Sequence, residues 1–242
     1  MRLQRGARAP RILSVVAAMV VALIFTAATP KLWAQIPFSQ ARILIEVNST
    51  AGDAGIQVFL DGEAWESVTI FRPDGRRILE VMGKGSLGKL GQTELFSESH
   101  EPSFDELPLE EFLEMFPPGE YRFFGKTVEG ETLVGTATFT HNIPAGPIIV
   151  SPRDGAVVNP NSTVIVWMPV TRPRGIQIVK YQVIVEREEP TLLVFSVDLP
   201  ATATSVTVPR EFLESGTEYI FEVLAIEAGG NQTITEGFFE TR

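Results

Sequence analysis

The stretch that begins at Gly216 constrains the fold of this chain more than any other. After this glycine, Tyr219, Phe221, Val223 and Ala225 alternate with other residues, as the buried side of a β-strand does. Trp167 lies well before them, within another short apolar run. A core tryptophan followed by an alternating aromatic strand predicts a β-sandwich.

Short strands can be placed throughout the last part of the chain, which we call the second module (residues 147–242). They are predicted at residues 147–151, 163–168, 179–186, 192–198, 204–208, 218–226 and 233–240. This number of strands in a module of this length is typical of an immunoglobulin-like sandwich.

The order and spacing of core markers in the second module resemble those of a fibronectin type III domain. The markers are Ile165, Trp167, Tyr181, Val183, Leu213, Gly216 and Tyr219. The resemblance implies a binding or spacer module without catalytic residues. It also implies that the hydroxyl of Tyr219 hydrogen-bonds back to the preceding turn.

The preceding part, which we call the first module (residues 42–142), has the same strand-rich pattern. Apolar runs at residues 43–47, 55–62, 65–71 and 76–83 are separated by turn residues, which we expect at Asp61–Gly62 and at residues 73–75. Two more strands are predicted at residues 121–128 and 132–140. The residues around Tyr121 echo those around Tyr219. We expect residues 142–147, with Pro144 and Pro147, to form a short, stiff joint between the modules.

One segment of the first module has a helical period. In residues 108–116 the apolar side chains of Leu109, Phe112, Leu113 and Phe116 form one stripe, and the following prolines end the helix. Ser103 and Glu106 have the spacing of a capping box. The chain is therefore predicted to be all-β, with two tandem immunoglobulin-like β-sandwich domains, the first with one short helix, after an N-terminal signal or anchor helix.

Residues 1–34 have the layout of an export signal. Arg2, Arg5, Arg8 and Arg11 precede an uncharged apolar run, and Ala34 is a suitable cleavage position. The run is also long enough for an uncleaved membrane anchor, which is the alternative. In either case we expect the modules to be secreted, periplasmic or on the cell surface, with membrane contact only through this segment if it is retained.

Charge and cysteine content exclude several classes of function. Beyond residue 34 the chain has 15 basic and 30 acidic residues, so nucleic acid and anionic membrane surfaces are not expected partners. The absence of cysteine excludes disulfides, thiolate nucleophiles and cysteine metal sites. A protein or glycan partner is expected, of unspecified identity.

Two sets of carboxylates are calcium candidates. Asp53, Asp61 and Glu63 lie at predicted strand ends of the first module, where aspartate is also common for turn reasons. A denser acidic run between residues 98 and 114, which includes Glu98 and Glu101, lacks the alternating spacing of an EF-hand and is interpreted as a solvated face. No cofactor is expected other than calcium.

His100 is the candidate for a catalytic centre, because Ser97, Ser99 and Glu101 are its neighbours in the sequence. The residues of a hydrolytic triad normally come from separate elements that fix their geometry. A solvated loop is therefore the preferred interpretation.

Alternation also predicts apolar residues on the outward face of the second module. With Tyr219 and Phe221 inward, Ile220, Leu224 and Ile226 point outward, as does Ile184 on a neighbouring strand. Such a face needs cover, either by the first module or by another protein. The sequence as a whole favours an exported, non-catalytic binding or spacer protein. The alternatives are a calcium-dependent adhesion module and a hydrolase centred on His100.

Overall fold

The computed structural model describes residues 35–242, so the predicted export signal lies outside the described residues. The described residues belong to one compact unit. Within the described residues, no helix has the length and apolarity that a membrane span requires.

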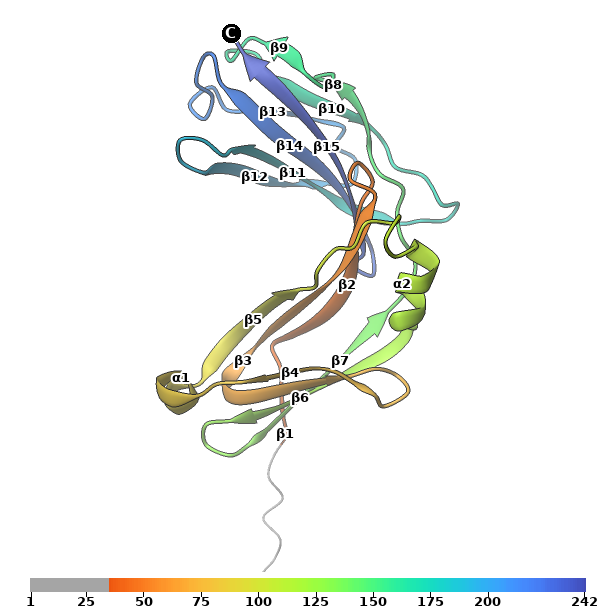
Figure 1. Cartoon of the computed structure of the whole chain (residues 1–242), viewed down its shortest axis with the longest axis vertical. Helices are drawn as coiled ribbons and strands as arrows, with labels where there is room; N and C mark the ends of the chain where they lie inside the picture. Colours follow the sequence, from red (N-terminus) through yellow and green to blue (C-terminus); the bar gives the residue numbers. More distant parts are fainter. Residues whose placement is uncertain (1–34) are drawn as a thin grey trace, which may run out of the picture. The chain divides into compact units, whose positions relative to one another are not determined.

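The first module is built from antiparallel strands and two short helices (Figure 1). Its elements are β2 (Gln40–Asn48), β3 (Asp53–Phe71), β4 (Arg77–Met82), α1 (Gly85–Leu90), β5 (Gln92–Glu98), α2 (Leu109–Met115), β6 (Gly119–Thr127) and β7 (Thr132–Phe139). A short strand, β1 (Gln35–Pro37), precedes the module and pairs with β7. The predicted helix is present as α2, whereas the separate helix α1 was not predicted.

The long strand β3 belongs to both layers of the first module. Its first part pairs with β2 and β5, and its second part pairs with β4 and β6. Inward side chains from both parts fill one core that includes the buried Trp65, together with Tyr121 and Phe123 of β6. The strand can serve both layers because its register shifts between Asp61 and Trp65.

The turn predicted at Asp61–Gly62 is wrong. The chain continues as β3 through these residues, and the buried Gly62 lies against Phe38, where a Cβ atom would stand 2.9 Å from the ring. Glycine therefore serves a close approach at this position. The turn predicted at residues 73–75 is confirmed, since Gly75 has a φ of 84° and donates to the Arg72 carbonyl.

Helix α2 packs its apolar stripe against the core of the first module, with Phe112 buried. Its N-cap is Pro108, and no side chain caps it. The capping box predicted for Ser103 and Glu106 is wrong, because the Ser103 carbonyl accepts from the backbone of Glu106 and Leu107 in a turn before the helix.

The second module is a sandwich of two sheets. One contains β8 (Ile148–Ser151), β10 (Val164–Met168) and β13 (Ser205–Thr207). The other contains β9 (Ala156–Val158), β11 (Ile178–Arg187), β12 (Leu193–Pro200), β14 (Glu218–Glu227) and β15 (Gln232–Thr241). Four of the predicted core markers, Trp167, Tyr181, Leu213 and Tyr219, are each about 1% exposed and lie in one core.

A tyrosine closes a turn in each module in the same way. The hydroxyl of Tyr219 accepts from the Glu214 backbone at 2.8 Å and donates to the Phe212 carbonyl at 3.3 Å. The hydroxyl of Tyr121 donates to the Pro117 carbonyl at 3.1 Å. The echo seen in the sequence therefore has a structural counterpart, and burial raises the pKa of Tyr121 to about 12.

Candidate functional site: an acidic groove at the junction of the modules

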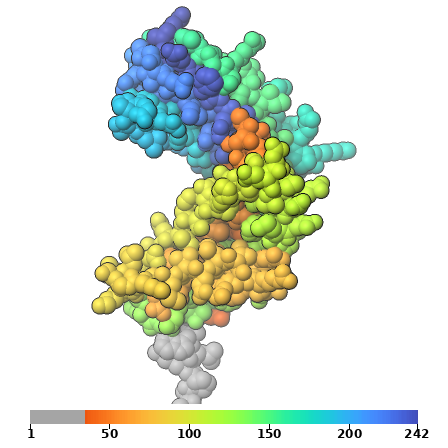
Figure 2. All heavy atoms as spheres, viewed as in Figure 1, coloured from red at the N-terminus to blue at the C-terminus, as the bar shows by residue number. Residues whose placement is uncertain are grey.

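The two modules meet along β2 and β15, which pair in parallel (Figure 1). The pairing joins Gln232–Ile234 to residues 46–48. Beyond it, the Ser49 backbone donates to the Ile234 carbonyl, and the Glu236 backbone donates to the Thr50 hydroxyl. Figure 2 shows the orange hairpin that follows β2 against the blue strand β15. We call this region the junction.

Asn231 is the polar centre of the junction. Its side-chain oxygen accepts from the Ile45 backbone at 3.0 Å, and its amide nitrogen donates to Thr140 and to the Asn142 carbonyl. Asn231, Gln232 and Thr233 have the sequence of an N-glycosylation acceptor. Asn231 is only 1% exposed, so this acceptor is inaccessible in the folded chain. Thr233 adds a hydrogen bond of 2.6 Å to the Pro144 carbonyl. The proline-rich joint is thus tied to the second module, and Asn231 also reaches Ile45 and Thr140 of the first.

The outward apolar residues predicted from alternation have different environments. Leu224 and Ile226 are buried with Ile234 in a small cluster at the junction, and Ile184 packs against them. Ile220 is half-buried and lies beside two other surface hollows. Cover by the rest of the chain therefore accounts for Leu224 and Ile226.

A groove of about 370 Å³ opens beside this cluster. Its apolar lining is Phe59 and Phe96 from the first module and Ile184, Leu224 and Ile234 from the second. The two phenylalanine rings lie 4.9 Å apart, and Phe96 is 56% exposed. Both modules therefore contribute side chains to one groove.

The polar lining of the groove is acidic and amide-bearing. It consists of Glu46 and Gln57 on one side, Gln182 and Glu222 on the other, and Gln232 between the modules. Gln232 donates to Glu46, and Gln57 donates to Glu98 at 2.8 Å. Amide donors therefore hold two of the carboxylates in place.

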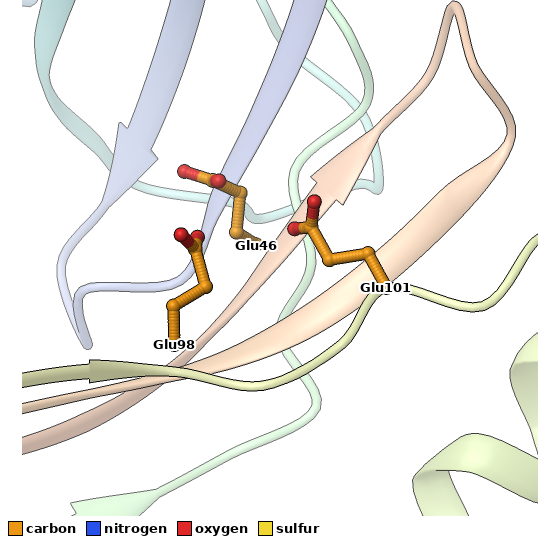
Figure 3. A group of neighbouring side chains, drawn as sticks. All are labelled: Glu46, Glu98 and Glu101. Atoms are coloured by element: carbon orange, nitrogen blue, oxygen red, sulfur yellow. The ribbon is translucent and has the colours of Figure 1, made fainter.

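Glu46, Glu98 and Glu101 form a carboxylate triad beside the groove. One oxygen from each lies within 4.8 Å of the others, and Figure 3 shows the three carboxyl groups directed to the same space. Glu46 comes from β2, Glu98 from the end of β5, and Glu101 from the loop that follows. Glu101 packs over Gly55, where a Cβ atom would stand 2.8 Å from its side chain. Glycine at this position leaves room for the third carboxylate.

Burial and charge repulsion raise the pKa values of several carboxylates at the junction. Burial is the largest cause that raises the pKa of Glu46 to about 7, with the charges of Glu98 and Glu101 contributing. Burial also raises the pKa of Glu222 to about 7, and the charges of Glu236 and Glu186 add to it. The pKa values of Glu101 and Asp53 are raised for the same reasons. Within the described residues, no ion pair includes any of these carboxylates, which are Glu46, Asp53, Glu98, Glu101, Glu186, Glu222 and Glu236.

The three carboxylates predicted as calcium ligands do not come together. Asp53 begins β3 and lies close enough to Glu101 and Glu236 to interact by charge. Asp61 lies further along β3 opposite Gln40, and Glu63 borders a different hollow near Thr127. The triad contains none of the three.

The hydrogen bonds around the two histidines serve the backbone within the described part of the chain. The Ser99 hydroxyl donates to the His100 carbonyl and accepts from the Ile56 backbone, so it serves the loop. No hydrogen bond of the described residues joins the His100 ring to a serine or a carboxylate. Nε2 of His141 lies 2.8 Å from the Phe116 carbonyl oxygen, which gives that ring a structural role.

Sequence reasoning missed Glu46, Glu222, Asn231 and Phe96. One signal was available for Glu46. This glutamate lies inside the otherwise apolar run of residues 43–47, all of which are buried. A strand that is covered on both faces reads in the sequence as a continuous apolar run and not as an alternating one.

The comparisons with known proteins concern the second module. Residues 151–240 match the family model of the fibronectin type III domain, so the predicted resemblance is confirmed. The fibronectin type III domain of human collagen alpha-1(XX) is 24% identical over 40% of this chain and 82% of that chain, with a TM-score of 0.30.

Two chicken structures match over more of the chain. The CNTN1 FN1–FN3 domains are 12% identical over 85% of this chain and 68% of theirs, with a TM-score of 0.36. A segment of two fibronectin type III domains from tenascin is 11% identical over 84% of this chain and 98% of its own, with a TM-score of 0.31. Domains of this family generally serve as binding or spacer modules and are typically non-catalytic.

Proposed function

We propose that this chain is a non-catalytic binding protein of the cell envelope or extracellular space, and that the groove at the junction is its binding surface. The observation that carries the proposal is that side chains of both modules line one groove. The match of residues 151–240 to a family of binding and spacer modules supports a non-catalytic role.

The location outside the cytoplasm rests on the predicted export signal. The hydrogen bonds at Asn231 and the pairing of β2 with β15 support a fixed junction. A fixed junction favours binding, because a preformed groove does not have to be ordered when the ligand arrives.

The test is a comparative capture from native envelope extract with the full chain as bait. Phe96→Glu places a charge on an exposed ring in the groove, whereas Met82→Glu changes a residue of equal exposure on β4, outside the groove. We expect a partner that wild type and Met82→Glu retain and Phe96→Glu loses. Identical sets of retained proteins for wild type and Phe96→Glu would exclude the groove as the binding surface.

The triad favours a second candidate function, calcium-dependent adhesion. Carboxylate oxygens are the ligands that calcium prefers, and three of them converge at Glu46, Glu98 and Glu101. A bound divalent cation would relieve the repulsion that raises the pKa of Glu46.

We expect calcium at about a hundred times its Kd to stabilise the fold by about 2.7 kcal/mol, and thus to raise the Tm by about 5 °C. A chelator should reverse the shift, and Glu98→Gln should abolish it. An unchanged Tm at millimolar calcium would remove this candidate.

A further inference from the structure

Within the described residues, the carboxylates at the junction form no ion pair, and His100 is the basic side chain whose charge acts on Glu101. The ion pairs of the described residues leave Glu46, Glu101, Glu222 and Glu236 without a lysine or arginine partner. The nearby Lys180 is paired with Asp198 at 2.8 Å. Buried or half-buried carboxylates without a counter-charge are costly, and a cation supplied from outside would lower that cost.

Apolar side chains also line the groove. The guanidinium of Arg42 lies 4.6 Å from the centroid of the Phe59 ring. The aromatic side of the groove therefore packs against a cation as well as against apolar groups. Phe96 stands exposed beside it, and Ile184, Leu224 and Ile234 face it from the second module. An occupant that brings only charge would leave the exposed ring of Phe96 in water.

We propose that the groove binds an extended segment of a partner protein in which a lysine or arginine stands two residues from a large apolar side chain, so that both point to the same side of the segment. Charge complementarity selects the basic residue, which would face Glu46 and Glu222. The apolar residue would cover Phe59 and Phe96, the part of the groove that a metal ion or a polyamine leaves uncovered. This inference rests on the proposed function, because it names the chemistry of the ligand for the same groove.

The probes are short labelled peptides titrated into the full chain, with chelator present throughout and binding read by fluorescence anisotropy. The first peptide places lysine and leucine in turn at every second position, with serine between them, so that both lie on one side of the extended chain. In the second peptide glutamate replaces the lysine, and in the third serine replaces the leucine. We expect the lysine–leucine peptide to bind at least about tenfold more tightly than either of the others, a factor that corresponds to the loss of one well-placed contact.

Two matched variants locate the peptide. Glu222→Gln should weaken the lysine–leucine peptide about tenfold, as expected for the loss of one charge-assisted contact. Glu218→Gln changes the same type of residue on the same strand but outside the groove, and should leave the affinity unchanged. The Tm of each variant, measured in parallel, establishes that it is folded.

Several results would overturn the proposal. These are equal binding of the glutamate–leucine peptide, equal binding of the lysine–serine peptide, equal competition by spermine, and an unchanged affinity in Glu222→Gln. If the peptides fail while the capture experiment still separates Phe96→Glu from Met82→Glu, the ligand chemistry is wrong and the proposed function stands. If the capture experiment fails as well, the proposed function is wrong.

Discussion

Replacing Asn231 with alanine should lower the free energy of unfolding by about 1–3 kcal/mol, the cost of leaving a buried hydrogen-bond group without its partner. The change removes four hydrogen bonds that reach Ile45, Thr140 and Asn142. The Ile45 backbone N–H then stays buried without an acceptor, because Ile45 is fully covered. Chemical denaturation at neutral pH measures the effect.

The control for this prediction is Asn142→Ala, which makes the same change at an exposed side chain of the joint. It should alter the free energy of unfolding by less than about 0.5 kcal/mol, as most surface changes do. A loss in Asn231→Ala as small as that of the control would mean that the amide does not hold the junction.

Replacing Glu46 with glutamine should stabilise the protein at pH 8 by about 2–3 kcal/mol and have little effect at pH 4.5. Glu46 has a pKa of about 7 in the folded chain, against an ordinary value of 4.5. Below 4.5 the carboxyl is protonated in the folded and unfolded chains alike, so it costs nothing. Between 4.5 and 7 the unfolded chain gives up its proton first, and stability falls as the pH rises. Above 7 the cost is complete, and an uncharged amide avoids it.

Denaturation at a series of pH values tests this prediction. Wild type should lose stability between pH 4.5 and 7, and Glu222 should contribute to the same loss. Glu94→Gln is the matched control, because Glu94 is an exposed carboxylate on β5. Its stability curve should follow that of wild type. If the stability of Glu46→Gln changed with pH in parallel with that of wild type between pH 4.5 and 7, Glu46 would not be buried as described.

The core of the second module could be predicted because its strands alternate. Tyr219, Phe221 and Val223 point inward, and the structure places them in one core with Trp167. The helix at α2 was equally readable, since Phe112 and its neighbours repeat with a helical period. These signals are local, and each depends on one buried face.

The groove could not be predicted in the same way because it depends on contacts between distant residues. Glu46 lies within an apolar run, and only the pairing of β2 with β15 brings it to Gln232. Asn231 follows Gly230 and looks like an ordinary turn residue, whereas its partners lie on β2 and in the joint. The misplaced turn at Gly62 has a similar cause, because the contact that requires glycine there is with Phe38.

The central claim is that the two modules form one body with a shared groove. Because the chain has no cysteine, the double variant Glu120→Cys and Glu211→Cys places one spin label on an exposed site of each module and nowhere else. The distance distribution between the labels should be narrow, and adding Asn231→Ala should broaden it. A broad distribution without that change would contradict the claim, because modules that move freely cannot hold one preformed groove.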